Sequence, residues 1–354
     1  MSRPTAIGVH IFAGGFTEGA KRHLDVVAHW EVSEFGVETS RANHPELQEI
    51  AVSKTATWPS YTADVVYANP PCAPWSAAGV HVGSSKRDYT EGFDPRDARV
   101  SCFSQCFDQL ERIRPTALVV ESVQRAWTAG RKFIEGQFAR ARALGYATSV
   151  LLHCGLDCGL PMKRRRVFFV AHRVALRVER PDVPGPRTVR EAWACLEGEE
   201  LGPVAPVTEH EILLLNNTPP GGTIQDTYMK MFGETRYDPV KKRYKGRPPF
   251  LALRVELDKP SPVATGGCHF YNPTEPRHVS VKEMQVLAGY PKTYRFIGKL
   301  GEQYAQISAA VTPPCGAWVA SVVAEAITRG EPAEIGGPTR VYDLEGKGRD
   351  EHVI

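Results

Sequence analysis

The first half of the chain alternates short apolar runs with longer amphipathic stretches. Residues 101–112 and 131–144 place apolar side chains three and four positions apart, which is the spacing of one helix face. Strands that alternate with such helices are typical of a mostly parallel sheet covered on both faces. The pattern therefore predicts a doubly wound α/β fold. Its expected strands are rich in β-branched and apolar residues and comprise residues 7–12, 26–30, 63–68, 116–120, 147–152 and 167–171.

Prolines interrupt this pattern from about residue 180 onward. Pro181, Pro184 and Pro186 fall close together, and further prolines follow up to residue 249. Prolines at this density oppose long helices and central strands, so a small irregular module is expected. Helical spacing returns at residues 280–288 and 315–328. The expected division is a main α/β domain (1–180), the irregular module (181–275), a C-terminal segment that completes the main domain (276–332) and a peripheral tail (333–354).

Composition and charge are those of an ordinary soluble enzyme. Of the 354 residues, 42% are hydrophobic and 23% are charged, a balance that disfavours a disordered, fibrous or membrane protein. Lys and Arg number 43 against 40 Asp and Glu, so any basic face for an anionic partner has to be local. The N-terminal stretch lacks the apolar segment of a signal peptide, and no apolar run reaches the roughly 18 residues of a spanning helix. We therefore expect a cytoplasmic protein with no membrane partner.

The eight cysteines are too sparse for a disulfide scaffold and are expected to be reduced thiols. Cys102 and Cys106 lie four residues apart, as do Cys154 and Cys158, which is the spacing of one helix face and not of a zinc knuckle. The spacing therefore predicts no metal site.

A thiol and a carboxylate follow two of the predicted strands. Cys72 comes after residues 63–68 in the sequence Asn-Pro-Pro-Cys, where two prolines hold the backbone in a rigid turn. Glu121 comes directly after residues 116–120. Ligands of open α/β sheets bind at the carboxyl ends of the strands, so both side chains are expected at one crevice. A nucleophile beside an acid is a working catalytic pair, whereas the alternatives are a buried apolar cysteine and a solvated acid.

Basic residues precede the predicted strand 167–171. The run from Lys163 to Arg166 forms either a solvated or phosphate-contacting face, or a source of positive charge for the crevice. In an extended segment alternate side chains point to opposite sides, so Arg164 and Arg166 share one side. Lys163 and Arg165 share the other. One of the two pairs can therefore place its positive charge at the crevice.

A glycine turn follows the first predicted strand and leads into a helical pattern. Glycines at that place let a cofactor approach the backbone, as in nucleotide-binding units. An acid at the end of the second predicted strand suits the diol of a ribose. The candidate cofactor residues in these two segments are Phe12, Ala13, Gly14, Gly15 and Glu31.

Taken in order, these motifs resemble those of the DNA cytosine-C5 methyltransferases, which use S-adenosylmethionine. The resemblance covers about residues 5–330 apart from the irregular module. It implies a Rossmann-like methyltransferase sheet, a target-recognition role for residues 181–275, double-stranded DNA as the partner, and a monomer. The similar segments are residues 12–19 (cofactor loop), 70–76 (nucleophile loop), 121–123 (Glu-Asn-Val), 162–166 (Gln-x-Arg-x-Arg), 258–262, 277–283 and 287–291 (the stretch after the target-recognition region) and 306–311 (Gln-Ile-Gly-Asn-Ala-Val).

The resemblance implies a covalent mechanism on a flipped-out base. The Cys72 thiolate would add to C6 of cytosine, after which C5 can attack the sulfonium methyl group. Arg164 and Arg166 would favour the thiolate, and Glu121 would share a proton with N3 of the ring. None of these groups reaches a stacked base, so the target cytosine has to leave the duplex. For the cofactor, the resemblance adds Asn69, Pro70 and Ala309 to the candidates.

Two further segments are candidates for contact with DNA. Residues 230–247 carry seven Lys or Arg against two acids, which suits phosphate neutralisation, although a solvated loop is the alternative. Residues 76–97, rich in Gly, Ser and charge, form either a lid over the flipped base or a long surface loop. The expected DNA-binding residues are Ser76, Lys230, Arg236, Lys241, Lys242, Arg243, Lys245 and Arg247.

Several positions depart from the family pattern. The cofactor loop is two residues shorter than usual, Met162 stands for Gln, Ser122 for Asn, and Ser308-Ala309 for Gly-Asn. Three alternatives stay open: cytosine-C5 modification in RNA or a free nucleotide, DNA binding without effective catalysis, and a structural metal role for the cysteines. The implied setting is the cytoplasm of a bacterium or phage-infected host, in restriction-modification or phage biology.

We expect that neutralising Lys241, Lys242 and Arg243 together weakens DNA binding. Each lost phosphate contact lowers the steepness of log affinity against log salt concentration by about 0.9. Fluorescence anisotropy with a labelled duplex at several salt concentrations measures both quantities. If affinity and salt dependence stay unchanged, residues 230–247 are not part of the DNA footprint.

Overall fold

A computed structural model of the chain describes residues 2–31, 36–50, 62–75, 97, 99–233, 252–263, 270–344 and 351–353. The chain divides into two compact units. The first, here called the sheet unit, comprises Met1–Cys158, Arg164–Val183 and Ala310–Ile354. The second, the small unit, comprises Gly159–Lys163 and Pro184–Ala309. By this division residues 276–309 fall in the small unit.

The sheet unit is built on a nine-stranded, mostly parallel sheet with the order β11-β10-β6-β7-β5-β4-β1-β2-β3. The strand β7 runs antiparallel to both β5 and β6, and β11 runs antiparallel to β10. This architecture confirms the predicted Rossmann-like α/β fold. The strands are β1 (Thr5–Val9), β2 (Asp25–Trp30), β3 (Gln48–Ile50), β4 (Val65–Ala68), β5 (Ala117–Ser122), β6 (Ala147–Cys154), β7 (Arg165–His172), β10 (Arg340–Asp343) and β11 (Glu351–Val353).

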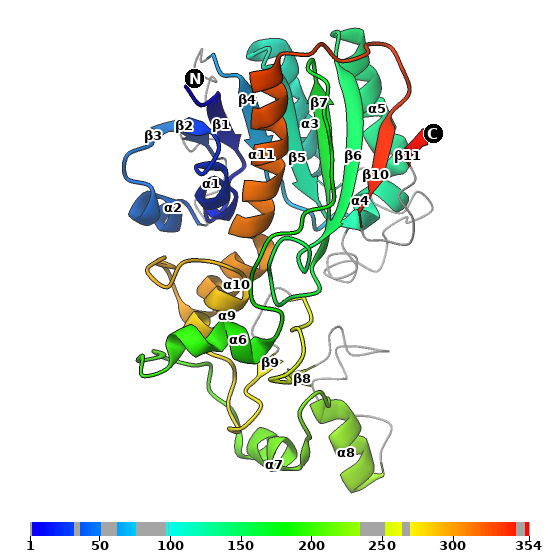
Figure 1. The fold of residues 1–354 in the computed structure, drawn as a ribbon. Helices are drawn as coiled ribbons and strands as arrows, with labels where there is room; N and C mark the ends of the chain where they lie inside the picture. Colours follow the sequence, from blue (N-terminus) through cyan, green and yellow to red (C-terminus); the bar gives the residue numbers. More distant parts are fainter. Residues whose placement is uncertain are drawn as a thin grey trace. The chain divides into compact units, whose positions relative to one another are not determined.

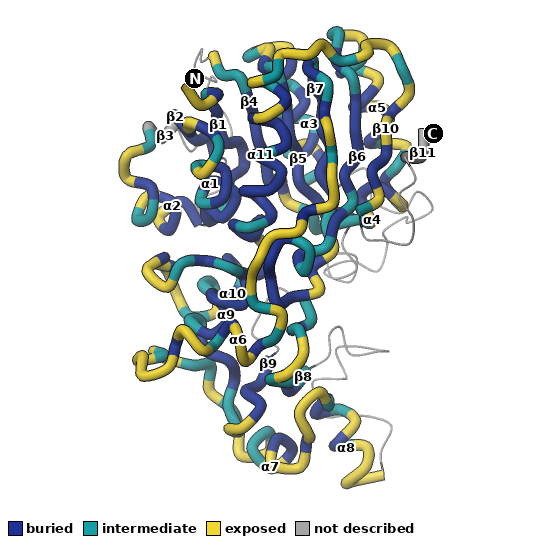
Figure 2. Tube along the Cα trace, viewed as in Figure 1, coloured by how far each residue is buried: buried dark blue, intermediate teal, exposed yellow. Residues whose placement is uncertain are grey.

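Helices cover both faces of this sheet (Figure 1). Two successive residues of β7 show the division, because Phe168 and Phe169 point to opposite faces. Phe169 packs against Phe103 of α3 and Phe138 of α5, whereas Phe168 packs against α1 and α11. The strands between these layers are buried along most of their length (Figure 2). The helices are α1 (Gly15–Ala20), α2 (Val37–Asn43), α3 (Arg99–Arg112), α4 (Gln124–Thr128), α5 (Arg131–Ala143) and α11 (Pro313–Arg329).

The helix α11 packs on α1, the helix that follows the glycine turn. A Cβ atom at Gly19 would lie 2.1 Å from the carbonyl oxygen of Pro313. Only glycine permits so close an approach of the two backbones. The apolar stretch Leu300–Arg329 is long enough to cross a membrane, but most of it is buried, as in the core helices of soluble proteins.

Most predicted elements agree with the structure, and the differences have local causes. β1 ends at Val9 instead of residue 12 because His10 and Phe12 both adopt a φ of 51°, which breaks the extended chain. β5 extends to Ser122, so that Glu121 lies within the strand. The segment expected to be a peripheral tail contributes β10, whose Val341 is buried and which pairs with β6.

The small unit consists of short helices and very short strands, as its prolines predict. Its own apolar cluster comprises Leu214, Leu215, Ile224 and Tyr271. The elements are α6 (Val189–Trp193), η2 (Ala194–Leu196), α7 (Glu209–Asn217), α8 (Ile224–Phe232), β8 (Leu253–Arg254), β9 (Phe270–Tyr271), α9 (Val281–Leu287) and α10 (Leu300–Ala309).

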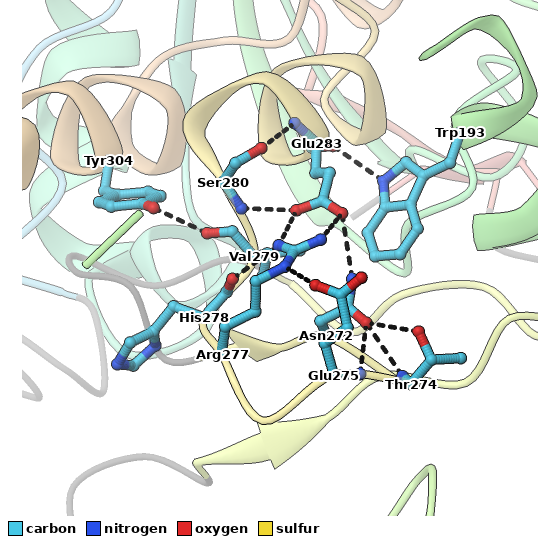
Figure 3. Close-up of polar contacts among 10 residues, drawn as sticks. All are labelled: Trp193, Asn272, Thr274, Glu275, Arg277, His278, Val279, Ser280, Glu283 and Tyr304. Atoms are coloured by element: carbon cyan, nitrogen blue, oxygen red, sulfur yellow. Dashed lines mark hydrogen bonds and ion pairs between the residues drawn. The ribbon is translucent and has the colours of Figure 1, made fainter. Parts of the chain in front are cut away.

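A buried glutamate organises the start of α9 (Figure 3). The Glu283 carboxylate accepts a hydrogen bond from the backbone N–H of Ser280, and the Ser280 hydroxyl accepts one from the Glu283 N–H. Arg277 donates to both Glu283 carboxylate oxygens at 2.7 and 2.9 Å, and Asn272 donates at 3.1 Å. Trp193 of α6 donates to the Glu283 carbonyl oxygen. One side chain thus caps a helix and joins it to the preceding loop.

We expect Glu283→Ala to destabilise the small unit by about 3 kcal/mol, because it removes the helix cap and leaves the Arg277 guanidinium without its bidentate partner. Scanning calorimetry of the full chain measures the change. Glu209→Ala is the matched control, since Glu209 is an exposed acid in the first turn of α7 and should change stability by less than about 0.5 kcal/mol. Equal melting profiles for the two variants would contradict this account of Glu283.

Candidate active site

The loop after β4 places Cys72 at the carboxyl edge of the sheet. Cys72 is half-buried, and its carbonyl oxygen accepts a hydrogen bond from the Trp75 backbone N–H at 3.1 Å. Trp75 is fully buried and packs against the rings of Phe103 and Phe133. The indole therefore anchors the turn that carries the thiol.

Glu121, near the end of β5, is held by two polar neighbours. Its side chain is buried, with 3% of the residue exposed. The Arg166 Nε atom lies 3.1 Å from one carboxylate oxygen, and the Asn69 amide donates to the other at 2.8 Å. The Asn69 side-chain oxygen Oδ1 in turn accepts a hydrogen bond from the backbone N–H of Val311. The carboxyl group is thereby fixed from β7, from the loop after β4 and from the segment before α11.

The basic run from Lys163 to Arg166, whose last two residues begin β7, alternates as the sequence predicts. Lys163 and Arg165 are exposed, whereas Arg164 is buried and Arg166 is half-buried. The Arg164 guanidinium donates to the carbonyl oxygen of Ala310 at 2.7 Å. Because β7 is antiparallel to β5, its first residues lie beside the last residues of β5, so both inward-facing arginines come close to Glu121.

The four candidate catalytic groups influence one another electrostatically. Burial raises the pKa of the Cys72 thiol, Arg166 and Arg164 act to lower this pKa, and Glu121 acts to raise it. Burial also raises the pKa of the Glu121 carboxyl group, against the effect of the two arginines. Burial lowers the pKa of Arg164 to about 10. The structure thus brings together a thiol, an acid that protonates readily and two cations.

The glycine turn lies at the same edge of the sheet, after β1. Phe12 and Gly14 have positive φ angles of 51° and 78°. Glu31, which follows β2, accepts a hydrogen bond from the Phe12 N–H at 2.9 Å, and His10 lies 3.9 Å from its other oxygen. A Cβ at Gly36 would come within 3.0 Å of the Phe12 backbone, so the turn is tightly enclosed. Such a turn with an adjoining acid can hold the nucleoside part of a cofactor.

The other candidates are placed elsewhere or lie outside the described residues. Pro70 is buried beside Asn69, whereas Ala309 is an exposed residue at the end of α10 in the small unit. Lys230 is exposed on α8, also in the small unit. Most of the expected lid, residues 76–96, is outside the described part of the chain. So are Ser76, Arg236, Lys241, Lys242, Arg243, Lys245 and Arg247.

Two buried side chains beside the candidate site were not found from the sequence. His153 of β6 and Cys315 of α11 line the same small cavity as Glu121 and Arg166. No local motif marks them, because Cys315 reaches the cavity only through the packing of α11 on the sheet.

The comparisons with known proteins agree on one family. Residues 8–328 match the profile of the family described as C-5 cytosine-specific DNA methylase. The chain is 26% identical to Type II methyltransferase M1.HphI of Haemophilus parahaemolyticus, over 92% of this chain and 87% of that protein. It is 29% identical to Type II methyltransferase M.BbvI of Brevibacillus brevis, over 73% of this chain and 67% of that protein.

Solved structures share the fold. One is a protein described as a DNA modification methyltransferase encoded within an E. coli prophage, with a TM-score of 0.64, 16% identity, and coverage of 92% of this chain and 99% of that chain. Another is a mutant of Spodoptera frugiperda DNMT2, with a TM-score of 0.58, 14% identity, and coverage of 91% and 99%. At these identities the likeness is one of architecture.

We expect Arg166→Gln to raise the pKa of Cys72, because it removes the cation that most favours the thiolate. A thiol with a higher pKa is less ionised at a given pH, so alkylation of Cys72 by iodoacetamide should slow at neutral pH and reach its maximum at higher pH. Mass spectrometry of the Cys72 peptide follows the reaction. Arg165→Gln is the control, since Arg165 is exposed on the other side of the strand. Identical pH profiles for both variants would show that Arg166 does not lower the pKa of Cys72.

Proposed function

The chain belongs to the C-5 cytosine-specific DNA methylase family, and on that basis we propose that it transfers a methyl group from S-adenosylmethionine to C5 of cytosine in double-stranded DNA. The observation that carries the proposal is the grouping of Cys72, Glu121, Arg164 and Arg166 at the carboxyl edge of the sheet. A nucleophile, an acid and two cations at one crevice are what an attack on an electron-poor ring position requires.

Cys72 is the nucleophile of the proposed reaction. Its thiolate adds to C6 of the cytosine ring, and the electron pair of the C5–C6 bond then becomes available at C5 for attack on the methyl group. Burial opposes ionisation of the thiol, and the cations of Arg166 and Arg164 offset part of this effect. Transfer of the C5 proton to a base such as water then expels Cys72 as a thiolate, and return of the N3 proton to Glu121 restores the ring and the enzyme.

Glu121 is the acid of the proposed reaction. Because burial raises the pKa of its carboxyl group, it takes up a proton more readily than an exposed glutamate. A protonated Glu121 donates to N3 of the cytosine, so that negative charge does not accumulate on the ring when the thiolate adds. Asn69 and Arg166 hold the carboxyl group in one orientation during this step.

The described residues fit a nucleoside-containing methyl donor. The enclosed turn at Phe12, Ala13, Gly14 and Gly15 and the neighbouring Glu31 form a compact site after β1 and β2. S-adenosylmethionine supplies an electrophilic methyl group on a sulfonium. The protein's part is to orient this group towards the cytosine and to exclude water.

Duplex DNA is the proposed acceptor, and the target base leaves the stack to reach Cys72. The similarity to bacterial proteins named Type II methyltransferases supports a DNA substrate and a place in restriction-modification or phage biology. The basic segment 230–247 supports phosphate contacts. A monomer in the cytoplasm suits this activity.

The proposal is tested by methyl transfer from labelled S-adenosylmethionine to duplex DNA and to RNA of the same sequence. We expect incorporation into DNA and a loss of at least about a thousandfold in Cys72→Ala, because the covalent step is removed. A duplex containing 5-fluorocytosine should form a covalent complex with the wild-type protein and none with Cys72→Ala. Incorporation into RNA alone would show that RNA and not DNA is the substrate. Turnover retained by Cys72→Ala would overturn the covalent mechanism.

A further inference from the structure

Three buried side chains with metal-ligating atoms meet in the sheet unit. His153 lies in β6, Cys158 in the turn that follows it, and Cys315 in the first turn of α11. Their exposed fractions are 0%, 0% and 3%. One ligand atom from each residue lies within 4.8 Å of the other two, and the Cys158 Sγ to His153 Nδ1 distance is 3.9 Å.

The imidazole is held firmly and has a polar atom to satisfy. The His153 ring stacks on Phe168 with a centroid distance of 4.8 Å and an interplanar angle of 4°, and Trp318 packs on it at 5.2 Å. Its Nε2 atom is buried and has no hydrogen-bond partner. A buried polar atom without a partner carries a cost of about 1–3 kcal/mol, which an ion bound at Nε2 would offset, while Nδ1 contacts the Cys158 sulfur.

We propose that His153, Cys158 and Cys315 together bind one zinc ion. Two thiolates and an imidazole are the donor types that zinc takes in proteins, with Zn–S distances of about 2.3 Å and Zn–N distances of about 2.0–2.1 Å. Those lengths place donor atoms about 3.5–4 Å apart, so donor atoms that lie within 4.8 Å of one another need to approach by about 1.3 Å at most. Ion binding releases the two thiol protons to solvent.

A disulfide between Cys158 and Cys315 is the competing use of the two sulfurs. The structure favours the metal, because burial keeps oxidants away from both thiols, and because a metal ion uses the imidazole beside them whereas a disulfide does not. A metal ion, in contrast, can enter while the chain folds. This inference does not depend on the proposed methyl transfer.

The site would connect distant segments beside Glu121 and Arg166. Binding would tie the turn after β6 to the first turn of α11. Since His153 and Cys315 line the cavity that also contains Glu121 and Arg166, the ion would stiffen one wall of that cavity. Three protein ligands leave the fourth position of a tetrahedral zinc ion for water or another small donor.

Metal analysis of the full chain tests the proposal. The protein is expressed with added zinc, purified without chelators and analysed by plasma mass spectrometry. We expect about one zinc per chain in the wild type, and less than about one tenth in Cys158→Ser and Cys315→Ser. Cys154→Ser is the matched control, because Cys154 is the last residue of β6, close to Cys158 in sequence but outside the cluster, and it should keep the ion. Cobalt substitution should give a thiolate-to-cobalt absorption band in the wild type and in Cys154→Ser alone.

A second measurement covers the case in which the cysteine variants do not fold. Unfolding the wild-type protein in guanidinium chloride in the presence of an organomercurial should release about one zinc per chain, detected with a chelating dye, because the two thiols then become accessible. A wild-type protein purified without zinc would overturn the proposal, as would equal zinc contents in all variants. So would a disulfide between Cys158 and Cys315, seen as a cross-linked peptide whose mass is lower by two hydrogen atoms. Each of these results is independent of methyl transfer, so the two proposals fail separately.

Discussion

The burial of the Glu121 carboxyl group is the constraint on which the candidate site depends. A carboxylate removed from water is costly unless it is paired and hydrogen-bonded. Here Arg166 approaches one oxygen and the Asn69 amide donates to the other, while Asn69 itself is held by Val311. The contacts of this one buried acid therefore hold together β7, the loop after β4 and the segment before α11.

The antiparallel strand β7 makes this pairing possible. In an all-parallel sheet, residues that precede a strand lie at the opposite edge from residues that end one. Because β7 is reversed, the arginines at its start lie beside the end of β5, with Ser122 paired to Val167 and Glu121 to Phe168. The reversal places positive charge where Cys72 and Glu121 need it, and the alternation along the strand turns Arg164 inward and Arg165 outward.

The helix α11 closes the sheet unit and adds chemistry of its own. Its packing on α1 relies on Gly19. In the segment before α11, the Val311 N–H donates to Asn69 and the Ala310 carbonyl oxygen accepts from Arg164. Its first turn brings Cys315 to His153 and Cys158. The helix α11 thus contacts both α1, which follows the glycine turn, and the small cavity lined by Glu121 and Arg166.

The sequence by itself determined the alternation of strands and helices and the place of Cys72, Glu121, Arg164 and Arg166 at strand ends, because side-chain periodicity and turn residues are local properties. It did not show that Asn69 donates to Glu121, that β10 joins the sheet, or that Cys315 meets His153. Only the tertiary structure decided these, because each depends on segments far apart in the chain. Their meeting is set by strand order and helix packing, which leave no mark in the spacing of neighbouring residues.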